Sequence, residues 1–117
     1  MKKVTIIVND GPSSMRSWNA IRLANGMLDV NMEVTIILFD EAVFCAKKGQ
    51  IPPVGLEGQN LSNKLAELTK LGGEVWACGT CMEAKGMDAD ELTEGVVETC
   101  MIDVCNSIKE SDNVLIF

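Results

Sequence analysis

Residues 74–86 read Glu-Val-Trp-Ala-Cys-Gly-Thr-Cys-Met-Glu-Ala-Lys-Gly, an apolar run that leads straight into a Cys-x-x-Cys pair. The run predicts a strand at residues 75–77, and the residues after it predict a brief helix. A thiol at such a junction meets unpaired backbone N–H groups and the positive end of the helix dipole, which favour the thiolate. We place Cys78 at or just before the first helical residue, so Cys78 is the candidate nucleophile.

Strands and helices alternate along the rest of the chain. β-Branched runs at residues 4–8 and 34–39 are typical of strands buried on both faces, and apolar spacing at 15–28 predicts a helix between them. This βαβ unit implies a parallel sheet. We therefore expect one α/β domain over residues 1–117, a three-layer sandwich with about five mostly parallel strands. Further expected elements are short helices at 42–46 and 88–92, helices after Asn60 or Ser62 and at 101–108, and strands at 95–99 and 114–117.

The composition of the chain excludes several classes of function. The 117-residue chain has five cysteines, no histidine and a net charge of −7. The negative charge argues against a nucleic-acid partner, which needs clustered Lys and Arg, and the missing histidine removes Ser-His-Asp and Cys-His catalysis. Because no apolar run is long enough for a membrane span or a signal peptide, we expect a cytoplasmic protein with reduced thiols and no membrane partner.

The loops that follow the strands carry the candidate site. In an open parallel sheet the ligand crevice lies beyond the carboxyl ends of the strands, where residues 9–14, 40–45 and 78–81 and Cys100 are expected to meet. Residues 9–14 lack the glycine series and the lysine of a phosphate loop, so no nucleotide or other cofactor is expected. The candidate substrate-binding residues in these loops are Asn9, Asp10, Gly11, Gly79 and Thr80.

Each cysteine also has a structural interpretation. Cys78 and Cys81 can be two buried thiols in a turn; if they are functional, Cys81 lies one helical turn later and is at most a resolving thiol. Cys45 and Cys105 adjoin or lie on apolar stripes and are predicted core residues, whereas the role of Cys100 stays open. No metal site is expected, because Cys100 and Cys105 do not form the second knuckle of a zinc ribbon.

The Cys-x-x-Cys pair superficially matches the active site of thioredoxin. Thioredoxin-like folds place this pair near the first strands and a cis-proline downstream of it. Here the pair follows the third predicted strand, and no proline occurs after Pro53. A thioredoxin-like dithiol would therefore lack its usual partner.

Four segments carry a family resemblance: Lys-Val-Thr-Ile-Ile-Val at 3–8, Asn9-Asp10-Gly11, residues 46–50 and, above all, residues 75–86. Together they resemble the DsrE/DsrF-like sulfur-relay family, which includes TusD-type and YchN-type proteins. The resemblance runs along essentially the whole chain. It implies a flavodoxin-like, or Rossmann-like, domain that forms a homo-oligomer, a trimer or a hexamer. It also implies that Cys78 occupies the position that carries a persulfide in several members.

On this resemblance we expect a sulfur carrier or sulfurtransferase. Cys78 would accept sulfur from a donor protein or a small persulfide and pass it to an acceptor thiol. The second cysteine, Cys81, departs from the members that work in hetero-oligomers around one active cysteine, so their donors and acceptors are not carried over. Two alternatives stay open: a dithiol oxidoreductase that uses Cys78 and Cys81, and a non-catalytic oligomeric binding subunit of the same family.

Overall fold

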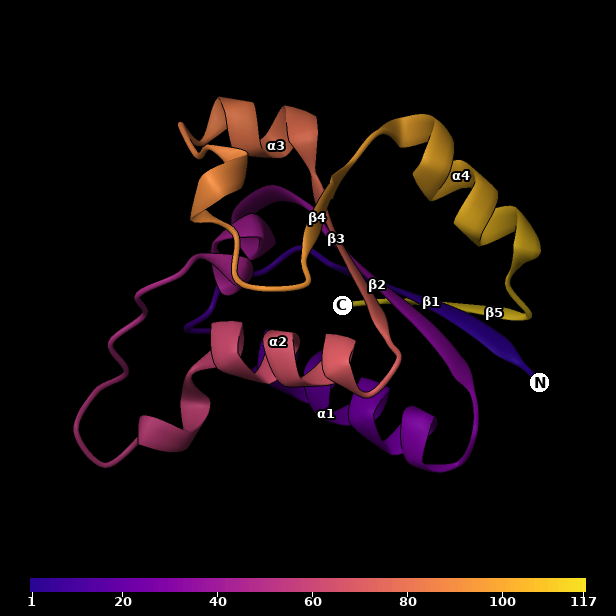
Figure 1. Ribbon diagram of the computed structural model, residues 1–117, viewed down its shortest axis with the longest axis horizontal. Coiled ribbons are helices and arrows are strands. Elements are labelled where there is room, and N and C mark those ends of the chain that lie inside the picture. The colour runs from indigo at the N-terminus through magenta and orange to yellow at the C-terminus, as the bar shows by residue number, and fades with distance from the viewer.

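The computed structural model describes residues 1–117 and contains one five-stranded sheet with helices on both faces (Figure 1). All strand pairs are parallel, and the strand order is β4-β3-β2-β1-β5. The expected parallel α/β sandwich is confirmed. The strands are β1 (Lys3–Val8), β2 (Glu33–Leu38), β3 (Glu74–Cys78), β4 (Val97–Thr99) and β5 (Asn113–Ile116).

The helices are divided unequally between the two faces of the sheet. Helices α1 and α2 cover one face, α4 covers the other, and α3 lies beyond the carboxyl end of β3 (Figure 1). None of the helices combines the length and the apolar character needed to cross a membrane. The α-helices are α1 (Met15–Asp29), α2 (Leu61–Lys70), α3 (Gly79–Ala84) and α4 (Met101–Glu110), and the 3₁₀ helices are η1 (Asp40–Ala46), η2 (Glu57–Gln59) and η3 (Ala89–Glu91).

The main core lies between the sheet and helices α1 and α2. Side chains alternate along a strand, so every second residue of β1, β2 and β3 points toward these helices. On the helix side, Ile21 of α1 and Leu65 of α2 pack into the same cluster and are fully buried. The strand residues of this core are Val4, Ile6, Val8, Val34, Ile36, Leu38, Val75 and Ala77.

Helix α4 faces the sheet with a different side from the one its apolar spacing predicts. The apolar residues of α4 at helical spacing are Met101, Val104, Cys105 and Ile108, and of these only Val104 is buried. Ser107 is buried in their place, while Met101 is 59% exposed. The prediction that Cys105 is a core residue is therefore wrong, because it lies exposed on the outer side of α4.

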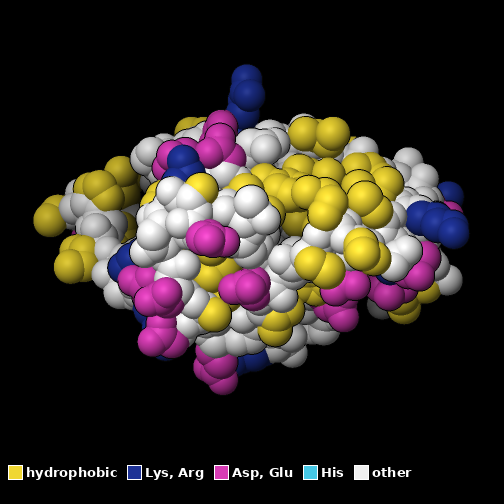
Figure 2. Space-filling model, turned by 90° about the horizontal axis from the view of Figure 1, so that it is seen from above, with side chains coloured by type: hydrophobic (Ala, Val, Ile, Leu, Met, Phe, Trp, Pro, Cys, Tyr) yellow, Lys and Arg dark blue, Asp and Glu magenta, His cyan; other side chains and the backbone are white.

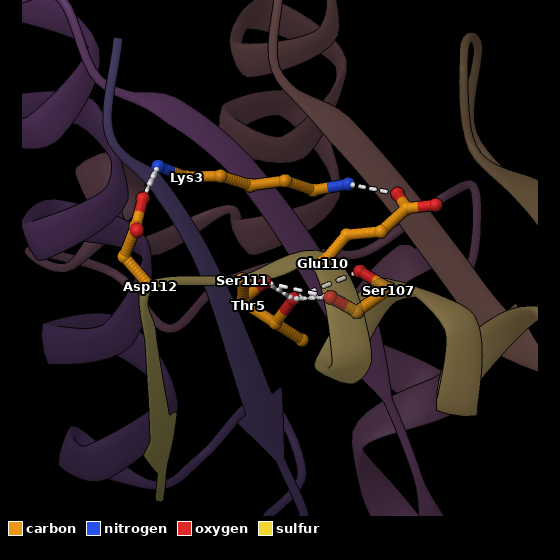
Figure 3. Close-up of polar contacts among 6 residues, drawn as sticks. All are labelled: Lys3, Thr5, Ser107, Glu110, Ser111 and Asp112. Atoms are coloured by element: carbon orange, nitrogen blue, oxygen red, sulfur yellow. Dashed lines mark hydrogen bonds and ion pairs between the residues drawn. The ribbon is translucent and has the colours of Figure 1, made fainter.

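A buried hydroxyl network explains the orientation of α4 (Figure 3). The Thr5 hydroxyl on β1 lies 2.8 Å from the Ser107 hydroxyl and 2.6 Å from the Ser111 hydroxyl, and Ser111 donates to the Ser107 carbonyl. Nearby, the Lys3 ammonium pairs with Glu110 at 3.0 Å. Because buried polar groups need partners, Thr5 draws the serine side of α4 onto the sheet and leaves the apolar side facing outward.

Replacing Thr5 by valine is expected to lower the free energy of unfolding by about 1–3 kcal/mol, because the buried Ser107 hydroxyl loses its partner at nearly constant volume. Denaturant unfolding monitored by circular dichroism measures the change. The matched control is Thr35→Val, which replaces a buried threonine at the same level of β2, outside this network. Equal losses in the two variants would contradict the role given to the network.

Candidate functional site

Cys78 joins the sheet to α3. It is the last residue of β3 and the N-cap residue of α3, with an extended backbone at φ −63° and ψ 119°. Its side chain makes no capping hydrogen bond, and the residue is 7% exposed. The predicted position of Cys78, directly before the first helical residue, is confirmed.

Cys81 follows one turn later and is half-buried beside Cys78. Burial raises the pKa of the Cys81 thiol above its ordinary value, and the hydrogen bond and charge of Cys78 raise it further. The backbone N–H of Asp40 opposes this by lowering the pKa, while the Asp40 carboxylate adds a smaller increase. The structure thus brings the two cysteines together and favours the protonated form of Cys81 near neutral pH.

The corner between β2 and η1 forms the second wall of the site. Asp40 has a positive φ of 51°, in the left-handed region that non-glycine residues seldom occupy. The Lys85 ammonium, at the end of α3, lies 3.2 Å from an Asp40 carboxylate oxygen and 2.6 Å from a Glu41 carboxylate oxygen. The sequence places residues 40–45 at this edge of the sheet, but neither acid is among the predicted site residues. Their place directly after a buried strand was the available signal.

Gly79 and Thr80 lie between the two cysteines, in the first turn of α3. Thr80 is exposed, and Gly79 lies against the side chain of Glu98 on β4. A Cβ added at Gly79 would come within 3.1 Å of a Glu98 carboxylate oxygen. The glycine therefore allows the carboxylate of Glu98 to rest against the turn that holds Cys78.

The loop of Asn9, Asp10 and Gly11 uses most of its polar groups to hold the fold together. The Asn9 side chain donates to the Phe117 carbonyl, and the Asp10 carboxylate accepts from Ser14, the N-cap residue of α1. Gly11 lies next to Glu41, because a Cβ there would be 3.5 Å from the Glu41 Cβ. This loop thus adjoins the site through Glu41.

The remaining cysteines lie in three different environments. Cys45 is fully buried, which confirms its prediction as a core residue, and burial raises its pKa to about 12. Cys100 is the exposed N-cap residue of α4, and Cys105 is exposed on the outer side of that helix. No group of three or more Cys, Asp or Glu side chains is arranged to hold a metal ion.

The surface hollows of the molecule lie away from Cys78. The largest, of about 620 Å³, lies beside α1 and Phe117, and two smaller ones of about 360 and 310 Å³ lie at the start of β3 and under residues 50–59. Neither Cys78 nor Cys81 lines any of the three. Cys78 is therefore largely buried at the edge of the sheet, outside the three hollows.

Comparison with known proteins finds relatives that cover nearly the whole chain. The chain is 37% identical to an uncharacterized protein of Methanopyrus kandleri, over 97% of this chain and 93% of that protein. It is 36% identical to an uncharacterized protein of Methanocaldococcus jannaschii, over 98% and 99% of the two chains.

Two solved structures share the fold. The ychN protein of E. coli superposes with a TM-score of 0.91 at 29% identity, with both chains fully covered. A protein of unknown function from Methanobacterium thermoautotrophicum superposes with a TM-score of 0.74 at 19% identity over 97% of each chain, which indicates a common fold only. The profile of the DsrE/DsrF-like family matches residues 2–117. On this match over nearly its full length, the chain belongs to the DsrE/DsrF-like family.

Proposed function

We propose that this protein is a sulfur carrier or sulfurtransferase in which Cys78 holds sulfur as a persulfide. Membership of the DsrE/DsrF-like family suggests a role in sulfur relay. The observation that carries the proposal is the position of Cys78, a free thiol without a capping bond at the carboxyl end of β3, with Cys81 beside it. This is the sheet edge at which open parallel sheets bind their ligands.

The proposed transfer is a thiol exchange without net oxidation. The Cys78 thiolate attacks the outer sulfur of a donor persulfide R–S–SH, a new sulfur–sulfur bond forms on Cys78, and the donor leaves as R–S⁻. Cys81 keeps its proton near neutral pH and supplies a hydrogen bond to the exchanging sulfur atoms. An acceptor thiolate then attacks the outer sulfur of Cys78–S–SH and releases the Cys78 thiolate.

The contact between the two thiols also favours a second candidate, a dithiol oxidoreductase. In that reaction the Cys81 thiolate attacks Cys78–S–SH at the Cys78 sulfur, which forms the Cys78–Cys81 disulfide and releases HS⁻. The same disulfide would form when a substrate disulfide is reduced. The two candidates differ in whether sulfur remains on Cys78.

Because none of the three hollows encloses Cys78, the proposed partners are donor and acceptor proteins as well as small persulfides. Gly79 and Thr80 flank the thiol and are the first proposed contacts of these partners. Asn9, Asp10 and Gly11 are proposed to contact them through the adjoining loop, which lies against Glu41. Five free cysteines suit the reducing cytoplasm, where we propose that the protein acts.

We further propose that copies of this chain assemble through the outer surface of α4 and the sheet beside it, as a trimer or a hexamer. Figure 2, which views the molecule from the side of α3 and α4, contains a broad group of hydrophobic side chains. Contiguous apolar surface of this kind favours burial against another protein. The exposed large hydrophobic residues of α4 and of β4 and β5, the strands before and after it in the chain, are here called the α4 surface: Val97, Met101, Ile102, Ile108 and Ile116.

Ile102→Asp is expected to weaken this assembly by more than about a hundredfold in dissociation constant, since it places an unpaired charge in an apolar contact. Ile102 is 74% exposed in one chain, so the substitution should leave the monomer folded. Light scattering after size-exclusion chromatography measures the change. The control is Val54→Asp, at a position 99% exposed on the loop before η2. A wild-type monomer at micromolar concentration would refute the assembly.

The test of the sulfur-carrier function is intact and peptide mass spectrometry after treatment with inorganic polysulfide. The expected result is one added sulfur on the peptide that contains Cys78, removed by a reductant and prevented by prior alkylation. A protein that gains no sulfur, or gains it only on the exposed Cys100 and Cys105, would overturn the proposal.

A further inference from the structure

The corner at Asp40 holds an unfavourable backbone conformation next to the thiol pair. Asp40 and Asn31 are the only non-glycine residues with positive φ, and only Asp40 belongs to the site. Such a conformation persists when its surroundings hold it in place, and it recurs where proteins position reacting groups. The contacts that hold Asp40 therefore bear on the reactivity of the neighbouring thiols.

Lys85 supplies those contacts from the other side of the site. It ends α3, the helix that begins at Cys78, and its ammonium bridges the carboxylates of Asp40 and Glu41 on η1. The Lys85 side chain is 27% exposed, less than either carboxylate. The bridge joins residues 44 positions apart in sequence. It therefore connects α3, which carries Cys81, to the start of η1, which carries Asp40.

The backbone N–H of Asp40 is the group in this corner that favours a thiolate on Cys81. The Asp40 carboxylate has the opposite effect on the pKa of Cys81. The Lys85 ammonium, paired with that carboxylate, therefore reduces the rise that the carboxylate causes in the pKa of Cys81. The same ion pair holds the backbone of Asp40 in position. The ionisable groups that act directly on Cys81 are Cys78 from β3 and Asp40 from η1. Lys85, the C-cap residue of α3, pairs with Asp40 and with Glu41.

We propose that Lys85 is a positioning residue of the thiol site: its bridge to Asp40 and Glu41 holds the left-handed corner at Asp40 against α3, beside Cys81, and neutralises both carboxylates. The inference rests on the proposed sulfur chemistry for its biological meaning. The predicted effect is a change in the reactivity of Cys81, which can be measured without any sulfur substrate.

The test is the rate of alkylation of Cys81 by iodoacetamide between pH 7 and pH 9.5, followed by peptide mass spectrometry. Lys85→Met is expected to slow the reaction about tenfold near neutral pH and to move its pH profile upward by about one unit. Lys85→Arg, which keeps the charge and the two contacts, is expected to stay within about twofold of the wild type. The control Lys47→Met removes another lysine–glutamate pair, 3.8 Å long, and should leave the profile unchanged.

Asp40→Gly separates positioning from a general loss of structure. Glycine accepts the left-handed conformation and keeps the N–H but removes the carboxylate. In this background Lys85→Met is expected to slow alkylation by less than about threefold, because the two residues act together. Three results would overturn the inference: an unchanged profile in Lys85→Met, failure of Lys85→Arg to rescue it, or a full tenfold loss in the Asp40→Gly background.

The two proposals fail in different ways. If the wild type takes up no sulfur from polysulfide but Lys85→Met shifts the alkylation profile, the sulfur-carrier function is wrong and the positioning role stands. If the wild type forms a persulfide on Cys78 and Lys85→Met alkylates as the wild type does, the function stands and the positioning role is wrong.

Discussion

Cys78→Ser is expected to abolish the gain of sulfur from polysulfide and to lower any sulfur transfer by more than about a hundredfold, because a hydroxyl at neutral pH is a far weaker nucleophile than a thiolate. The substitution replaces only the sulfur atom. Cys78 is the N-cap residue of α3 without a side-chain capping bond, so the fold should not depend on its sulfur. Intact-mass measurement and thermal unfolding of the same sample test both statements.

Cys81→Ser distinguishes the two candidate reactions. A sulfur carrier that uses Cys78 alone should still gain one sulfur, and should hold it longer, because no thiol remains to form the Cys78–Cys81 disulfide. A dithiol oxidoreductase should lose activity equally in both variants. Cys105→Ser is the matched control, since Cys105 is exposed on the outer side of α4, apart from the thiol pair. Retention of the sulfur adduct in Cys78→Ser would contradict the role given to Cys78.

Cys45 is expected to lower the free energy of unfolding at alkaline pH. This thiol is fully buried, and its sulfur lies 3.6 Å from the Asp10 carbonyl, to which it donates. Burial raises its pKa from 9.0 to about 12, the Asp10 charge adds to the rise, and a hydrogen bond with Ser17 opposes it. The folded chain thus keeps a proton that the unfolded chain releases above pH 9.

Because the folded chain keeps this proton, the stability of the fold decreases as the pH rises. A raised folded-state pKa gives a contribution that is complete below pH 9 and is lost as the pH rises from 9 toward 12. The loss is about 1.4 kcal/mol for each pH unit in that range, which gives about 2 kcal/mol by pH 10.5. Denaturant unfolding of the wild type at pH 8 and pH 10.5 measures it.

Cys45→Ala provides the control, because alanine cannot ionise and the lysines contribute equally to both proteins. The cavity lowers the stability of the variant at every pH, so the informative quantity is the difference between the two proteins. That difference is expected to shrink by about 2 kcal/mol between pH 8 and pH 10.5. A difference that stays constant would mean that Cys45 ionises in the folded chain as readily as in the unfolded one.

Much of the fold could be predicted from local patterns. The β-branched runs at β1 and β2 are apolar on both faces, which is the pattern of a parallel sheet covered on both sides. Asn60 was one of two expected caps, and its side chain accepts from the Asn63 N–H at the start of α2. The largest difference at a strand boundary is in β4, which begins at Val97 rather than at residue 95.

The orientation of α4 could not be predicted in this way. Apolar spacing assumes that a helix turns its apolar stripe toward the sheet, but the sheet offers the Thr5 hydroxyl at this point. The buried hydroxyl needs partners, so the serine side of α4 faces inward. Cys105 and the α4 surface are exposed for the same reason.

The position of Cys78 was determined by the sequence itself, since a short apolar strand followed by small and polar residues sets a strand-to-helix junction through local interactions alone. Only the tertiary structure decided what surrounds that thiol. Cys81, the left-handed corner at Asp40 and the bridge from Lys85 come together through the pairing of β2 with β3 and the packing of α3 on η1. Such contacts join residues some forty positions apart, and no local pattern encodes the distance between them.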